Sequence, residues 1–263
     1  MTNPVTLHYS EQGIGTPVVL LHGFPFSSAI WQTQQQGLSN DYRVIALDLR
    51  GHGASPAPEG TYDMETMAQD VLTLLDSLDV ERAAIIGHSM GGYVTLALWR
   101  LAPERFSALG LISSQASADS DEARKNRYKT AEKVFIEGSS AVAQAMLPKL
   151  FAPHTPDDET FIEQVNTLIL NTRPSGIIGT LKGMAARPDS TDLLPHINIP
   201  VLILTGDHDQ LIAPQKADAM AALIPTATLV SVENAGHMPM LEQPQAVLLA
   251  MRNFLNEVKN EVK

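Results

Sequence analysis

The sequence predicts an α/β fold in which a mostly parallel central sheet is flanked by helices and carries an inserted helical lid. Short apolar runs alternate with stretches in which apolar residues recur at helical spacing, an alternation typical of a parallel sheet covered by helices. Several runs consist almost wholly of aliphatic or β-branched residues, as strands buried on both faces do. The chain has 263 residues, 44% of them hydrophobic, which suffices for one large core with an insertion.

Seven apolar runs are expected to form the strands. They are Val5–Tyr9, Val18–Leu21, Arg43–Asp48, Ala83–Gly87, Leu109–Ser113, Val201–Thr205 and Thr228–Val232. Stretches with helical spacing are expected to flank the sheet. They are Met64–Leu78, Tyr93–Leu101, Pro214–Leu223 and Gln245–Val258.

The region from residue 115 to residue 188 interrupts the alternation, because it offers helical stretches and no convincing strand. Glycine and proline residues divide it into four expected helices. They are Asp121–Glu137, Ser139–Leu147, Asp157–Leu170 and Pro174–Ala186. We therefore predict a core domain made of residues 1–114 and 189–263, with residues 115–188 as a helical lid, or cap.

Composition excludes several classes of function. The formal net charge of -11 would repel nucleic acids and anionic lipid headgroups, so neither is an expected partner. The chain has no cysteine, which excludes disulfides, thiolate metal sites and cysteine nucleophiles. Neither a secretion signal nor an apolar run of membrane-spanning length is apparent, so a cytoplasmic location is expected.

A candidate nucleophile lies in the sequence Gly87-His88-Ser89-Met90-Gly91, which joins an apolar strand directly to a helical pattern. This is the context of a nucleophile elbow, in which a strained turn lifts a serine hydroxyl above the sheet. Small residues two positions to either side of Ser89 leave room for that turn. The N-terminus of the following helix favours a developing oxyanion, so the Met90 N–H is the expected first donor. Phe24 N–H, from the loop after an earlier strand, is the expected second donor.

Serine needs a positioned imidazole to accept its proton and a carboxylate to fix the imidazole tautomer. Among the eight histidines, His237 lies just after a predicted strand and before a predicted helix, where loops of an open α/β sheet carry chemistry. His22, His52 and His88 are expected to be structural. Asp207 and Asp209 both follow another strand, and Asp209 is preferred because it has room to turn back toward His237.

Five segments of the chain together resemble the α/β-hydrolase superfamily. They are His22-Gly23-Phe24-Pro25, Asp48-Leu49-Arg50-Gly51-His52-Gly53-Ala54-Ser55, Gly87-His88-Ser89-Met90-Gly91-Gly92, Gly206-Asp207-His208-Asp209 and Gly236-His237. The lid helices and residues 182–189 are most similar to the 3-oxoadipate enol-lactonase and small carboxylesterase group, whose members need no cofactor. The resemblance implies a triad of Ser89, Asp209 and His237, in the family's chain order. It also implies oxyanion donors at Phe24 and Met90. The family usually opens with a strand hairpin, and here only one predicted strand precedes residues 18–21.

These observations predict a carboxylic ester hydrolase that cleaves a small-molecule ester or lactone through an acyl-enzyme on Ser89. Neither a cofactor nor a metal is expected, because no histidine and carboxylate cluster has ligand-like spacing. A hydrolase-like sensor with slow turnover and a cofactor-free perhydrolase stay open as alternatives, and a protein partner is not indicated. The substrate pocket is expected between lid and sheet. Its apolar candidates are Phe24, Phe26, Trp31, Met90, Met146, Phe151, Met184 and Met238. A row of basic residues in 124–133 is interpreted as a solvated helix face.

Overall fold

The structure is a computed structural model that describes residues 4–153, 155 and 159–261. Within these residues a seven-stranded sheet has the strand order β1-β3-β2-β4-β5-β6-β7, in which β1 is antiparallel to β3 and every other pair is parallel. The strands are β1 (Tyr9–Gln12), β2 (Thr16–Leu21), β3 (Tyr42–Leu47), β4 (Ala83–His88), β5 (Phe106–Ile112), β6 (Val201–Gly206) and β7 (Ala227–Val232). The predicted α/β fold is confirmed, and six strands lie within three residues of their expected limits.

The first predicted strand is wrong. Residues 5–8 precede the strand, which begins at Tyr9 and runs to Gln12. This short edge strand is partly exposed and polar, and what defines it is its backbone pairing with β3, as in Tyr9 with Leu47. A sequence scan for apolar runs does not detect such a strand. One strand precedes β2 in the described part of the chain.

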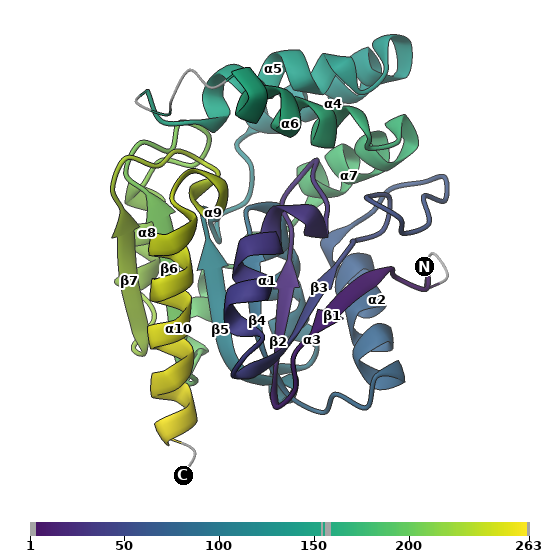
Figure 1. Cartoon of the computed structure of the whole chain (residues 1–263). Coiled ribbons are helices and arrows are strands. Elements are labelled where there is room, and N and C mark those ends of the chain that lie inside the picture. Colours follow the sequence, from purple (N-terminus) through teal and green to yellow (C-terminus); the bar gives the residue numbers. More distant parts are fainter. Residues whose placement is uncertain (1–3, 154, 156–158, 262–263) are drawn as a thin grey trace.

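Helices cover both faces of the sheet, as Figure 1 shows. One face carries α1 (Gln32–Leu38) and α10 (Pro244–Glu261), and the other carries α2 (Met64–Ser77) and α3 (Met90–Leu101). Helix α8 (Gln215–Ala221) packs on β6 and β7. Shorter elements are η1 (Ser28–Trp31), η2 (Pro103–Arg105), η3 (Thr191–His196) and α9 (Pro239–Glu242). No described helix combines the length and apolar character that a bilayer-spanning helix needs.

Four helices lie together over one end of the sheet (Figure 1). They are α4 (Asp121–Glu137), α5 (Ser140–Leu150), α6 (Glu159–Leu170) and α7 (Pro174–Ala186). Helix α4 packs mainly on α7. The predicted limits of α4 and α7 match, whereas α5 continues through Pro148 for three further residues, to Leu150. Asp157, where the third of these helices was expected to begin, lies outside the described residues.

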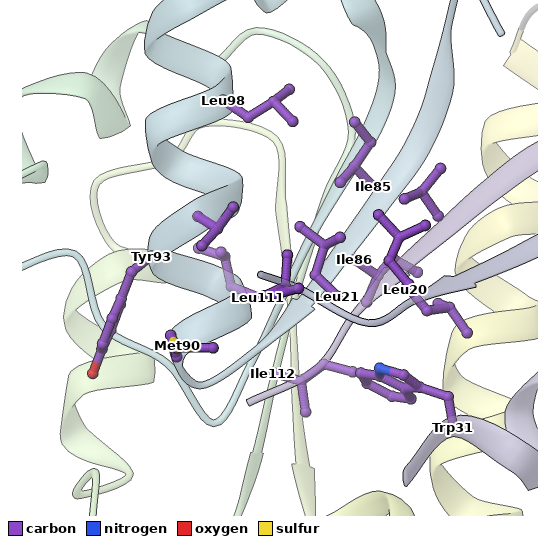
Figure 2. Close-up of a cluster of buried hydrophobic side chains, with 14 of the residues drawn as sticks. Leu20, Leu21, Trp31, Ile85, Ile86, Met90, Tyr93, Leu98, Leu111 and Ile112 are labelled. Atoms are coloured by element: carbon purple, nitrogen blue, oxygen red, sulfur yellow. The ribbon is translucent and has the colours of Figure 1, made fainter. Parts of the chain in front are cut away.

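The core is centred on β2, β4 and β5, whose aliphatic side chains are fully buried. Figure 2 shows part of this cluster, formed by all three of these strands and helix α3, with Leu20, Leu21, Ile85, Ile86, Leu98 and Leu111. Burial on both faces explains why these strands are almost continuously apolar in sequence.

A buried ion pair joins the loop after β3 to α2. The Arg50 guanidinium donates to Asp70 through Nε at 2.5 Å and Nη2 at 2.7 Å, and both side chains are 0% exposed. The Asp70 carboxylate also accepts the Val5 N–H at 3.0 Å. Removal of one member leaves the other charge buried, which is much more costly than the loss of an exposed pair.

We expect Asp70→Ala to lower the free energy of unfolding by about 3–5 kcal/mol, because the Arg50 charge stays buried. Glu11→Ala is the matched control, since Glu11 pairs with Arg43 at a partly exposed site and its removal costs about 1 kcal/mol or less. Urea unfolding followed by circular dichroism measures both. An equal loss of unfolding free energy in the two variants would contradict the conclusion that the buried pair of Arg50 and Asp70 matters more than an exposed one.

Candidate active site

Ser89 lies in the strained turn between β4 and α3. Its φ is 50° and its ψ is -113°, a left-handed backbone region that a residue with a side chain seldom adopts. Backbone hydrogen bonds hold the turn, because Ser89 N–H donates to Ile112 O at 2.8 Å and Gly92 N–H donates to Ser89 O at 2.9 Å. The Ser114 hydroxyl donates to the same Ser89 carbonyl at 2.9 Å.

Close packing at Gly87 and Gly91 explains the glycines of this turn. A Cβ on Gly87 would lie 2.3 Å from the Gly91 carbonyl carbon, and one on Gly91 would lie 2.4 Å from Leu21 O. Both contacts are with backbone, which cannot rotate away as a side chain can. The start of α3 therefore packs directly against the ends of β4 and β2.

Three loops bring Ser89, His237 and Asp209 into one hydrogen-bonded row. Ser89 Oγ lies 3.0 Å from His237 Nε2, and His237 Nδ1 lies 2.8 Å from Asp209 Oδ2. With a proton on Nδ1, the imidazole donates to Asp209 and accepts from the serine hydroxyl. His237 and Asp209 are buried, with side chains 2% and 0% exposed.

The structure also separates the two candidate aspartates. Asp207 Oδ1 accepts the Ala235 N–H at 3.2 Å and so braces the loop that carries His237. Asp209 Oδ1 accepts the N–H groups of Leu211 and Ile212 at 2.8 and 2.9 Å, which leaves Oδ2 for the imidazole. Burial alone would raise the pKa of the Asp209 carboxyl, but His237 and the two backbone donors hold this pKa below its ordinary value. Asp209 is therefore ionised at neutral pH.

Two supports of the His237 loop are not apparent from the sequence. His88 Nε2 lies 2.8 Å from the His237 carbonyl oxygen, so a proton on this nitrogen completes a hydrogen bond. Glu242 accepts the Gly236 N–H at 2.8 Å through one oxygen and the Ala152 N–H at 2.8 Å through the other. Glu242 thus joins the His237 loop to the segment after α5. Glu242 is the last residue of the short helix α9, and no motif around it in the sequence indicates this role.

Buried neutral histidines surround the site, as expected of structural histidines. Burial is the largest cause that lowers the pKa of His52 and of His88 to about 3 each, and it also lowers the pKa of His22. His22 fixes the loop after β2, because Nδ1 lies 2.9 Å from Gly23 O and Nε2 accepts the Leu49 N–H at 2.9 Å.

One expected oxyanion donor lies at the start of the helix after Ser89, and the other lies in the loop after β2. Met90 is the first residue of α3, and Phe24 follows β2 within the loop that His22 holds. That loop is also fixed from above, because the Thr172 hydroxyl donates to Pro25 O at 2.6 Å. Phe24 lines the same cavity as Ser89 and His237.

A cavity of about 380 Å³ opens above Ser89, between the sheet and the helices α4, α5 and α7. Its lining residues are Phe24, Ser89, Tyr93, Gln115, Asp119, Ala123, Asn126, Arg127, Thr130, Val142, Ala145, Met146, Leu181, Met184, Leu211, Ile212 and His237. The lining is mainly apolar, with amide, hydroxyl and charged groups gathered toward α4.

Phe24, Met146 and Met184 line the cavity as predicted. The other predicted pocket residues do not line it, and they are Phe26, Trp31, Met90, Phe151 and Met238. Phe26, Trp31 and Met238 are 0% exposed and belong to the hydrophobic core, and Figure 2 places Trp31 in that buried cluster. The Phe151 ring packs on Phe161 with centroids 5.2 Å apart. Phe26, Trp31 and Met238 are close to site residues in sequence, but their side chains are buried in the core, whereas Phe151 packs on a residue of α6.

Comparisons with known proteins agree with this geometry. The family model for the alpha/beta hydrolase fold matches residues 16–244. The chain is 31% identical over 245 residues to 3-oxoadipate enol-lactonase 2 of Acinetobacter baylyi, covering 92% of this chain and 90% of that protein. A solved structure of a thermophilic esterase from Thermogutta terrifontis, with malate bound, is 39% identical. It superposes with a TM-score of 0.95, covering 97% of this chain and 94% of the other.

One relative is longer than this chain. The dihydrolipoyllysine-residue acetyltransferase component of the acetoin cleaving system of Pseudomonas putida is 32% identical over 250 residues. The alignment covers 92% of this chain but only 64% of that protein.

Stability is expected to fall as pH decreases from about 7 to about 5. His52 and His88 stay neutral in the folded protein down to about pH 3, while the unfolded chain protonates both near their ordinary pKa of 6.5. The unfolded state therefore binds more protons in this interval, and each histidine costs about 2 kcal/mol of unfolding free energy between the two pH values. Urea unfolding at both pH values measures the change.

His88→Gln is expected to reduce that change by about 2 kcal/mol, the share of one histidine, whereas His196→Gln, at an exposed position, is expected to leave it unchanged. The same pH dependence in all three proteins would mean that buried histidines are not its source.

Proposed function

The chain belongs to the alpha/beta hydrolase fold family, and on that premise we propose that it hydrolyses a carboxylic ester or lactone of a small molecule. The observation that carries the proposal is the row Ser89, His237 and Asp209, with contacts of 3.0 and 2.8 Å at the floor of a cavity. This arrangement suits nucleophilic catalysis, because the base lies within reach of the nucleophile and a carboxylate orients the base.

In the proposed acylation step, Ser89 Oγ attacks the carbonyl carbon while His237 Nε2 accepts the hydroxyl proton. Asp209 remains ionised and stabilises the imidazolium that forms. The tetrahedral intermediate collapses when His237 returns the proton to the leaving oxygen, which gives the alcohol and an ester of Ser89. Water, activated by the same imidazole, then hydrolyses this acyl-enzyme and releases the acid.

The negative charge of the intermediate requires donors on the other side of the carbonyl. We assign this role to the backbone N–H groups of Phe24 and Met90. Met90 opens the 12-residue helix α3, whose N-terminal end carries partial positive charge. Donors fixed in advance need no reorganisation when the oxyanion forms, and one such donor contributes roughly 10²- to 10³-fold in rate.

Residues 115–188 are proposed to act as the lid over this site, with residues 1–114 and 189–263 as the catalytic core. Lid helices supply much of the cavity wall, including Met146 and Met184. They also brace the catalytic loops, because Leu150 O accepts the His237 N–H at 2.8 Å. The named activities of the relatives, an esterase and an enol-lactonase, support ester and lactone substrates.

Ser89→Ala is expected to lower kcat/KM for short p-nitrophenyl esters by about 10³-fold or more, because the nucleophile is lost. Ser77→Ala, at an exposed position on α2, serves as the control and is expected to keep full activity. An organophosphonate should label the wild-type protein on Ser89 and leave the variant unlabelled. Stoichiometric labelling with turnover below about one per minute would instead favour a small-molecule sensor.

Asp209→Asn and Asp207→Asn form a matched pair within one turn. The first is expected to lower kcat by about 10³- to 10⁴-fold, because the amide no longer favours a proton on His237 Nδ1. The second removes a charge but keeps a side-chain oxygen that can accept the Ala235 N–H, and it is expected to cost about tenfold or less. Steady-state kinetics on one ester measure kcat for both variants. A larger loss of kcat in Asp207→Asn than in Asp209→Asn would mean that Asp207, and not Asp209, is the carboxylate of the triad.

A further inference from the structure

One basic residue of α4 does not belong to a solvated helix face. The side chain of Arg127 is 23% exposed and lines the cavity with Ser89 and His237, whereas Arg124 and Lys133 on the same helix are 45% and 50% exposed. The interpretation of residues 124–133 as a solvated row is therefore wrong at this position, because the helix turns Arg127 toward the cavity.

A buried carboxylate holds Arg127 in place. Asp119 accepts from Arg127 Nε and, at 3.3 Å, from Arg127 Nη2. The same carboxylate accepts from Arg187 Nη1 at 2.6 Å, and the Asp119 and Arg187 side chains are each 3% exposed. Arg187 is fixed in turn, because its guanidinium lies over the Tyr93 ring at 4.0 Å and donates to Ser117 O at 2.9 Å.

Two positive charges share the Asp119 carboxylate. Burial would raise the pKa of the Asp119 carboxyl, but Arg127 and Arg187 hold it below its ordinary value, so it is ionised. Arg187 also interacts with the exposed carboxylate of Asp189, and neither of these two residues is part of the cavity lining. Asp119 is the only carboxylate among the described residues that line the cavity. Arg127 Nη1 contacts Met184 Sδ at 3.4 Å, and a thioether is a weak acceptor. The Tyr93 hydroxyl, in the same cavity lining, also interacts with the Arg127 guanidinium. A positive charge without an equal counter-charge in a place of low polarity favours an anion beside it.

We propose that the substrate carries a free carboxylate in addition to the ester or lactone that is cleaved, and that Arg127 binds this carboxylate. Asp119 and Arg187 position the Arg127 guanidinium, and the amides of Gln115 and Asn126 lie in the same cavity lining. The planar guanidinium of Arg127 presents paired N–H donors, which match the two oxygens of a carboxylate. This inference rests on the proposed function, because it names the substrate class of the same site.

Pairs of esters that differ only in this charge test the proposal. Mono-4-nitrophenyl glutarate and adipate place a carboxylate on the acyl side, and their methyl-capped diesters are neutral matches. 4-Acetoxybenzoate and its methyl ester form the corresponding pair for the alcohol side. In at least one pair, kcat/KM of the wild-type protein is expected to be about tenfold or more higher for the anion, after subtraction of the uncatalysed rate.

Arg127→Gln is expected to remove this preference, so that the ratio of anionic to capped ester falls to about one. Lys125→Gln is the control, since it removes an exposed positive charge from the same helix and is expected to leave the ratio unchanged. If Arg127→Gln does not fold, Arg127→Lys, which loses the paired N–H donors, is expected to lower the ratio about threefold or more.

The outcomes separate the two proposals. No turnover of any ester would contradict the proposed function. Turnover in which the capped esters react as fast as the anionic ones, in all pairs, would overturn the carboxylate site and leave the esterase intact. An equal fall of the ratio in Arg127→Gln and Lys125→Gln would assign the preference to overall charge and would also overturn the site.

Discussion

The left-handed backbone of Ser89 is the constraint on which the rest of the site depends. A residue with a side chain holds this conformation only where the surrounding structure imposes it, at a cost of roughly 1–3 kcal/mol. Here β4, β5 and α3 impose it through hydrogen bonds to both backbone groups of Ser89. The glycines on either side let the helix start pack against β2 at a distance that no side chain would permit. The position of the hydroxyl therefore follows from the packing of the sheet itself.

Three histidines near the site carry no charge. His22, His52 and His88 are buried and uncharged, and they serve as hydrogen-bonding side chains that fix loops. The charge that remains behind His237 is that of Asp209. In a poorly solvated place this charge acts strongly on the imidazole, since little water screens it. The charged side chains of the cavity lining itself are Arg127 and the Asp119 carboxylate that holds it.

The lid helices and the core depend on each other. Lid residues contact the catalytic loops at separate points, with Thr172 on the loop of Phe24 and Leu150 on the loop of His237. Glu242 adds a carboxylate bridge from the core to the segment after α5. A movement of these helices would therefore be transmitted to His237 and to the loop of Phe24. The proposed lid and the proposed catalytic residues belong to one hydrogen-bonded assembly.

Sequence alone determined the α/β fold, the places of six strands and the lid helices, because burial on two faces or on one helix stripe leaves a strong periodic pattern. It also indicated Ser89 and His237, since each follows a buried strand at the same sheet edge. Only the tertiary structure decided where individual side chains point, because the hydrophobic pattern of a sequence does not fix this direction. Only the turn after β6 shows which of two aspartates reaches the imidazole, and only the rotation of α4 shows that Arg127 faces the cavity. The edge strand β1 is defined by hydrogen bonds to β3, and backbone hydrogen bonds leave no trace in side-chain periodicity.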